Sequence, residues 1–170
     1  MRRIQITLLT TFLVITASAF GQSNKVLDGL ANSYDHTQEA IASIAKVAEN
    51  MTEAYQYLSS NGAKRFIKFS LEGFEQAAQQ IDAAKSEVSS ILNTSNDTDI
   101  KQSIELILNQ YQDIQDDIDR GIVATKQAKE ERQISEIDKS LKKASEAIES
   151  VLMKMIATLE KTNEVVLQMH

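Results

Sequence analysis

The 170-residue sequence contains no cysteine, no proline and no tryptophan, and it has only five glycines. Without cysteine the chain can form no disulfide, no thiolate metal site and no covalent c-type haem attachment. Proline and glycine interrupt helices most strongly, so their absence or scarcity favours long helices. Charged residues make up 25% of the chain and hydrophobic residues 42%, a composition typical of a globular domain. We therefore expect a single all-α domain.

The first 21 residues have the three parts of a secretory signal peptide. Arg2 and Arg3 supply positive charge, residues 4–15 are mostly apolar, and the small-residue site Ala19-Phe20-Gly21 follows. We predict cleavage after Gly21, which leaves Gln22 as the N-terminus and exports the chain to the periplasm or the extracellular space. Cleavage two residues earlier and retention as a membrane anchor stay open. No later stretch is apolar enough to span a bilayer, so we expect no stable membrane span after cleavage.

Four segments carry apolar or small residues at alternating steps of three and four, which keeps one stripe of an α-helix facing a partner. These segments predict helices over about 24–60, 63–93, 98–132 and 135–168. The stripe of the last is Ile137, Leu141, Ala144, Ile148, Val151, Met155, Leu159, Thr162, Val166 and Met169. The stripe of the first is Leu27, Leu30, Tyr34, Thr37, Ile41, Ile44, Ala48, Met51, Tyr55 and Leu58.

Turn and capping residues separate these segments. Gly62 is placed to close the first helix in a left-handed conformation, and Asp97 or Thr98 to cap the third. The last join has no glycine or proline, but the apolar stripe changes phase near Gln133. There Ser135 with Asp138 fits a capping box. The alternative is one unbroken helix over 98–169 that packs as a dimer.

Short joins place consecutive helices antiparallel, and a 3.5-residue repeat gives left-handed packing. The sequence therefore predicts an antiparallel up-down-up-down four-helix bundle with coiled-coil-like packing over residues 22–170, about 45–50 Å long. At one end, bulky residues of the first two helices would face small residues of the third. The bulky set is Tyr55, Leu58, Phe66 and Phe69, and the small set is Gly121, Thr125 and Ala128.

Residues for metal, cofactor or catalytic chemistry are sparse. His36 and His170 are the only histidines, and neither lies in the Glu-x-x-His pattern of di-iron bundles. His170 has no methionine placed across from it as a second haem ligand, so we expect no metal and no cofactor. Four aspartates crowd two turns of the third helix, which we interpret as a solvated acidic face: Asp113, Asp116, Asp117 and Asp119. With no paired carboxylates or nucleophile–base pair predicted to face inward, we expect no enzyme activity.

Charge is the least ordinary feature. After signal removal the chain has 16 basic and 24 acidic residues, a net charge of −8 that disfavours nucleic acid. The predicted topology gathers nine of the cations at one end: Lys64, Arg65, Lys68, Lys126, Lys129, Arg132, Lys139, Lys142 and Lys143. Many acids gather at the other: Asp28, Asp35, Asp82, Glu87, Asp97, Asp99, Glu105, Glu160 and Glu164.

Two function classes fit these observations best, and the long amphipathic helices also permit a third, a self-assembling or membrane-active helical protein that opens its bundle onto lipid. The first is a non-catalytic exported module, a monomer or small homo-oligomer, whose basic end binds an unknown protein or anionic partner. The alternative is a small-molecule or cofactor-binding bundle, with its ligand between helices near Tyr34, Tyr111 or the gap at Gly121.

Overall fold

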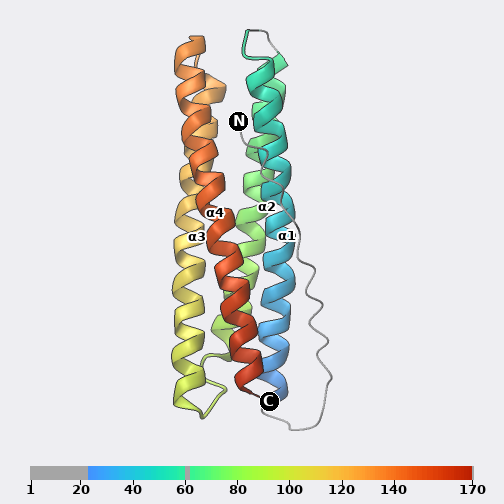
Figure 1. The fold of residues 1–170 in the computed structure, drawn as a ribbon, viewed down its shortest axis with the longest axis vertical. Coiled ribbons are helices and arrows are strands. Elements are labelled where there is room, and N and C mark those ends of the chain that lie inside the picture. The colour runs from blue at the N-terminus through green and yellow to red at the C-terminus, as the bar shows by residue number, and fades with distance from the viewer. Residues whose placement is uncertain (1–22, 60–61, 170) are drawn as a thin grey trace.

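A computed structural model describes residues 23–59 and 62–169 of the chain. These residues form four helices and no strand, as expected for an all-α chain, and the helices lie side by side as a four-helix bundle (Figure 1). The helices are α1 (Ser23–Gln56), α2 (Gly62–Ile91), α3 (Thr98–Glu130) and α4 (Ile134–Gln168). The predicted signal peptide, residues 1–21, lies outside the described residues.

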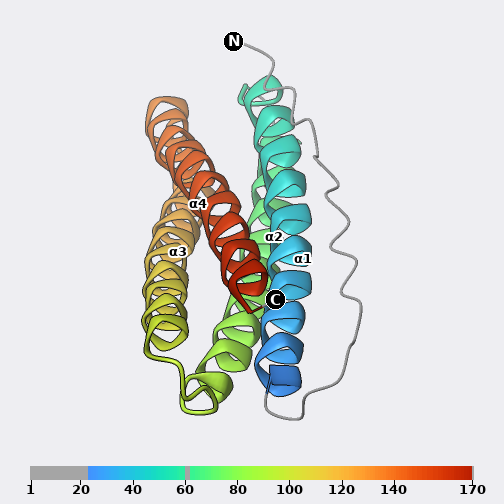
Figure 2. The same cartoon turned by 60° about the horizontal axis from the view of Figure 1, so that its bottom comes forward.

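The helices pack as two hairpins. Contact is most extensive between α1 and α2, followed by α3 with α4, and smallest between α1 and α4. The α1–α2 and α3–α4 joins lie at one end of the molecule, and the α2–α3 join at the other (Figure 1). Figure 2 shows α4 running obliquely, from beside α3 at the first end towards α1 at the other. The α1–α4 seam is therefore the loosest of the four.

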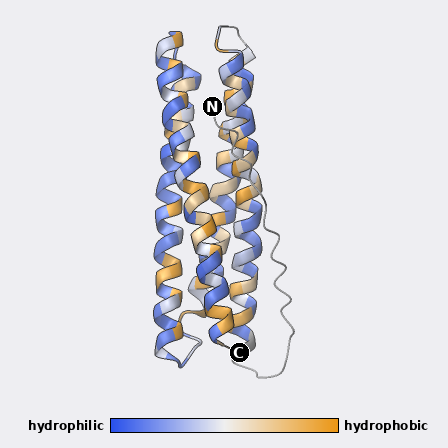
Figure 3. Cartoon of the chain, in the orientation of Figure 1, coloured by the Kyte–Doolittle hydropathy of each residue, from blue (hydrophilic) through white to orange (hydrophobic). Residues whose placement is uncertain are grey.

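Each helix is amphipathic, with hydrophobic and hydrophilic residues alternating along it (Figure 3). The largest fully buried side chains come from all four helices: Leu30, Ile44, Met51, Ile67, Phe74, Ile81, Ile104, Ile107, Tyr111, Ile114, Ile118 and Leu141. Complete burial of one such side chain stabilises a fold by about 1.5–3 kcal/mol. Tertiary packing of these stripes thus holds the helices in place.

The predicted stripe of the first helix is half right. Leu30, Thr37, Ile44 and Met51 are buried, but the alternate members Tyr34, Ile41, Ala48 and Tyr55 are only half-buried. The other buried positions of this face are Ser33, Ala40, Val47 and Ala54. Small side chains there suit the close approach of α2, since a methyl added to Gly73 of α2 would lie 2.6 Å from Val47. The larger residues face out of that contact and remain half-buried.

Several predicted helix ends need correction. The first helix ends at Gln56, a turn covers residues 57–59, and Gly62 begins α2 instead of closing α1. The second and third helices each end two residues before the predicted position.

The capping predictions had mixed outcomes. Asp97 caps α3 as predicted, because its Oδ1 accepts bonds from the N–H groups of Asp99 at 2.8 Å and Ile100 at 3.2 Å. The fourth helix begins after Gln133, so the capping box predicted at Ser135 is wrong. The break there separates α3 from α4, which contradicts the unbroken-helix alternative.

Candidate functional site

The nine predicted cations lie on two hairpin tips at the same end of the molecule (Figure 1). We call the first the α1–α2 tip, residues 57–59 and 62–69, which carries Lys64, Arg65 and Lys68. The second is the α3–α4 tip, residues 126–143, which carries the other six: Lys126, Lys129, Arg132, Lys139, Lys142 and Lys143. All nine side chains are exposed. We call this surface of nine cations the basic end.

The α1–α2 tip has positive charge without local compensation. No acidic residue occurs between Glu53 and Glu72, and the first turn of α2 contains none. Within the described part of the chain, no carboxylate lies within ion-pair distance of Lys64 or Arg65. Lys68 Nζ is 3.6 Å from Glu72 Oε1, but both side chains are exposed, and such pairs contribute only about 0–1 kcal/mol. The positive charges of this tip therefore face solvent.

Aromatic rings accompany these cations. The rings of Tyr57 and Phe66 stack at 5.6 Å with an interplanar angle of 16°. The Arg65 guanidinium lies over the ring of Phe69, 5.4 Å from its centroid. Tyr57 is 46% exposed and Phe69 36% exposed. The prediction that Phe69 packs inward is therefore wrong, and sequence spacing missed this aromatic surface.

The α3–α4 tip has a mixed charge. Its six cations stand among four acids, Glu130, Glu131, Glu136 and Asp138. Lys139 Nζ lies 4.0 Å from Glu136 Oε2, and Lys129 stands in the last turn of α3, where a cation complements the helix dipole. This tip therefore compensates part of its own charge.

The gap predicted at Gly121 is occupied by a neighbouring side chain. A methyl group added to Gly121 would lie 2.5 Å from two ring carbons of Phe74, which projects from α2. A bulky residue does face a small one here, as even packing density requires. The bulky residue is Phe74, whereas the prediction named aromatic residues of the tip. The Phe74 ring therefore fills the space that the missing side chain of Gly121 leaves.

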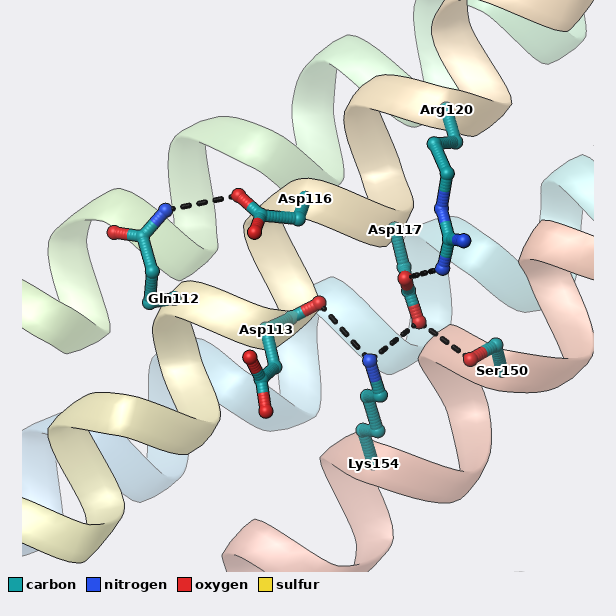
Figure 4. Close-up of polar contacts among 7 residues, drawn as sticks. All are labelled: Gln112, Asp113, Asp116, Asp117, Arg120, Ser150 and Lys154. Atoms are coloured by element: carbon teal, nitrogen blue, oxygen red, sulfur yellow. Dashed lines mark hydrogen bonds and ion pairs between the residues drawn. The ribbon is translucent and has the colours of Figure 1, made fainter.

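A buried ionic cluster, which sequence reasoning missed, joins α3 to α4 (Figure 4). Asp117 is only 1% exposed, and its carboxylate accepts bonds from Arg120, Ser150 and Lys154, the last with Nζ 2.8 Å from Oδ2. Lys154 also donates to the Asp113 carbonyl oxygen at 3.2 Å. The predicted solvated face therefore holds for Asp113, Asp116 and Asp119, which are exposed, but is wrong for Asp117.

A second stripe on α3 could have revealed Asp117. Ile114, Asp117, Gly121, Ala124 and Ala128 follow steps of three and four, and all are buried. Because a bundle helix packs against two neighbours, a single stripe does not account for all of its buried positions. The partner across the contact, Lys154, interrupts an otherwise apolar segment of α4.

A small polar network crosses the middle of the bundle. The Tyr111 hydroxyl lies 2.7 Å from Thr37 Oγ1, and Thr37 donates to the Ser33 carbonyl oxygen at 2.7 Å. Tyr111 is fully buried, and burial raises its pKa above the ordinary value of 10.0, although its hydrogen bonds to Thr37 and Ser33 lower it. Since Thr37 satisfies the hydroxyl, Tyr111 acts as a structural contact between α3 and α1.

The other sequence candidates lie apart from this network. His36 is half-buried, and its Nδ1 lies 2.9 Å from Gln80 Oε1 on α2. His170 lies outside the described residues. Across the described ranges, no group of three or more His, Asp or Glu side chains is placed to hold a metal ion.

A shallow groove of about 660 Å³ runs along the outside of α3 and α4. Arg120, Val123, Lys143 and Ser150 are among its lining residues. Its charged walls and apolar floor offer space for a small polar molecule, and Lys143 of the basic end is one of its walls.

None of the helices in the described part of the chain combines the length and apolar character needed to cross a membrane. The chain matches no protein-family model, no curated protein and no solved structure with which it was compared.

Proposed function

We propose that this protein is an exported, non-catalytic binding module whose basic end, led by the α1–α2 tip, binds an anionic macromolecule. The observation that carries the proposal is the α1–α2 tip itself: three exposed cations and two exposed rings with no acid between Glu53 and Glu72. Long-range attraction of this kind raises association rates and is weakened by salt.

The charge of the α1–α2 tip has no evident role in folding. Lys64 and Arg65 stand at the N-terminus of α2, where the helix dipole disfavours cations by a few tenths of a kcal/mol each. Neither makes an ion pair within the described residues. A surface charge that opposes helix stability and is not neutralised by a nearby carboxylate supports a binding role.

We further propose an up-down-up-down arrangement with coiled-coil-like packing, in which residues 22–170 form one domain after signal cleavage. The short joins, the small contact between α1 and α4, and the alternation of joins between two ends support this arrangement. The charged and apolar parts of residues 1–21 support export. A net charge of −8 disfavours nucleic acid as the partner.

The test is retention of the mature chain, residues 22–170, on heparin and on immobilised polyglutamate, two anionic polymers of different chemistry. We expect retention on both and elution by moderate salt. The variant Lys64→Glu/Arg65→Glu should lose retention without any fall in its thermal stability. A matched control, Lys25→Glu/Lys46→Glu on exposed positions of α1, changes net charge equally and should be retained. Equal loss in both variants, or no retention of the parent, would contradict the proposal.

The groove along α3 and α4 favours a second function, the binding of a small polar molecule between Arg120 and Lys143. Native mass spectrometry of the mature protein from its source compartment tests it. A discrete bound mass supports this function, and the bare sequence mass argues against it.

A further inference from the structure

We propose that the anionic partner is a lipid membrane, onto which the basic end docks with the exposed rings of Phe69 and Tyr57 in the headgroup layer. This inference rests on the proposed function and names the partner of the same surface. It concerns peripheral docking, which needs no membrane-spanning helix.

The chemistry of the α1–α2 tip matches a lipid interface. Tyrosine is favoured at the level of the headgroups, because its ring combines an apolar body with a polar hydroxyl, and phenylalanine is typical of the apolar face of interfacial helices. Lysine and arginine side chains beside them reach anionic phosphates while their apolar stems stay lower. At this tip Arg65 lies over Phe69, so one cation and one ring already share a position on the same face of α2.

The geometry favours a flat, extended partner over a compact one. The cations of the basic end are divided between two tips on different hairpins, and both tips lie at the same end of the molecule (Figures 1 and 2). A planar anionic surface contacts both tips at once, whereas a small acidic segment fits only one. The α3–α4 tip, although partly compensated, still has two more cations than acids.

The depth of the rings indicates an oblique approach. Phe69 is seven residues beyond Gly62 in α2, which is about 10 Å along the helix axis. Interfacial segments lie roughly 5–10 Å into the headgroup region. A tilted hairpin therefore turns the face of α2 that carries Arg65 and Phe69 towards the membrane, so that the guanidinium and the ring reach the headgroup layer together. The acidic end of the bundle then points away from the negative surface, which orients the molecule.

The experiment uses the mature chain and vesicles of phosphatidylglycerol and phosphatidylcholine in equal parts, with phosphatidylcholine alone as the neutral comparison. The chain has no tryptophan, so Phe69→Trp supplies a single fluorescent reporter at the site. We expect co-flotation with the anionic vesicles only, a blue shift of the tryptophan emission, and quenching by brominated lipid. Lys64→Glu/Arg65→Glu should weaken vesicle binding at least about tenfold. The control Lys25→Glu/Lys46→Glu should bind within about twofold of the parent, since no membrane contact is assigned to those positions.

The outcomes separate this inference from the proposed function. Retention on heparin and polyglutamate without vesicle binding overturns the lipid inference and leaves an acidic macromolecule as partner. Vesicle binding with no change in tryptophan emission also overturns it, because attachment is then purely electrostatic. Absence of binding to polymers and vesicles alike contradicts both. The variant Phe69→Ser gives a second check: vesicle binding should fall while retention on heparin stays unchanged.

Discussion

The two hairpins of this bundle differ in where they use their polar groups. The α3–α4 hairpin places charge inside, with Asp117 held by Lys154, Arg120 and Ser150 between its helices. The helices of the α1–α2 hairpin approach closely at small residues, as at Gly73 against Val47, and Lys64 and Arg65 at its tip make no ion pair among the described residues. Both tips therefore expose cations, but only the α3–α4 hairpin also uses charge to fix its own helices.

The residues expected to affect stability therefore lie apart from those expected to affect binding. Removal of one partner from a buried ion pair is costly, so substitutions at Asp117 should act on folding. Exposed cations contribute little to folding, so substitutions at the α1–α2 tip should act on binding. The following predictions test that separation.

The largest effect is expected from Asp117→Ala. The change leaves the Lys154 ammonium and the Arg120 guanidinium without their shared carboxylate between α3 and α4. Removal of one partner of a fully buried pair costs about 3–5 kcal/mol. Because Lys154 is 37% exposed and regains water, we expect a loss of about 2–3 kcal/mol in the free energy of unfolding, measured with urea.

Asp116→Ala is the matched control for this prediction. Asp116 is exposed and accepts a bond from Gln112 at 2.9 Å on its own helix, so its removal should cost less than about 0.5 kcal/mol. Equal losses at Asp116 and Asp117 would show that the ionic cluster does not hold α3 to α4.

Gly121→Ala should have the next largest effect. The added methyl group must displace the Phe74 ring, and overpacking of a core costs about 1–3 kcal/mol. Alanine recovers up to about 1 kcal/mol of helix propensity, so we expect a net loss of about 1–2 kcal/mol. The substitution Phe74→Leu should cost less in the Gly121→Ala background than in the parent, as a double-mutant cycle measures.

Tyr111→Phe should cost about 1 kcal/mol, the typical value of one buried hydrogen bond. Its effect also depends on pH. Burial raises the pKa of Tyr111 above 10.0, so the unfolded chain ionises at a pH where the folded one stays protonated. The stability from this group is complete below pH 10 and falls as pH rises through the folded pKa. The difference in unfolding free energy between parent and variant should therefore shrink above pH 10. A difference that is constant from neutral pH to well above pH 10 would contradict this account.

The smallest effect on stability is expected from Lys64→Glu/Arg65→Glu at the α1–α2 tip. Acids at a helix N-terminus are favoured by the dipole, so the unfolding free energy should rise slightly, by less than about 1 kcal/mol in total. The same variant should lose anion binding. A clear loss of stability would show that the tip cations take part in folding and would erase the contrast between the hairpins.

The sequence predicted four helices because each repeats apolar residues over many turns, and that signal survives errors in individual positions. The burial of single positions was predicted poorly where a helix packs against two neighbours. The α1 stripe was half wrong because Val47 packs closely against α2 and is buried, whereas Tyr34 is only half-buried. That difference depends on how the other helices pack. Asp117 was misplaced for the same reason, since its burial follows from α4.

The candidate surface was only partly accessible from the sequence. The nine cations were assigned to one end from topology, and they do lie on two tips at that end. The exposed ring of Phe69 was missed because bulky residues at this end were expected to face the small residues of the third helix. Exposure at a hairpin end depends on how far the neighbouring hairpin extends over it, and local sequence does not encode that.

The fit of Phe74 into Gly121 has a consequence for how the length of this protein can change. Bundles with repeating stripes tolerate insertion of whole seven-residue units, because the stripes stay in phase. Here a shift of α3 past α2 by one unit would bring Ile114 or Ala128 to the Phe74 ring in place of the glycine. An insertion between this contact and the α2–α3 join must therefore occur in both helices together. The contact between Gly121 and Phe74 thus fixes the register of α3 against α2, so the two hairpins must change in length by the same steps.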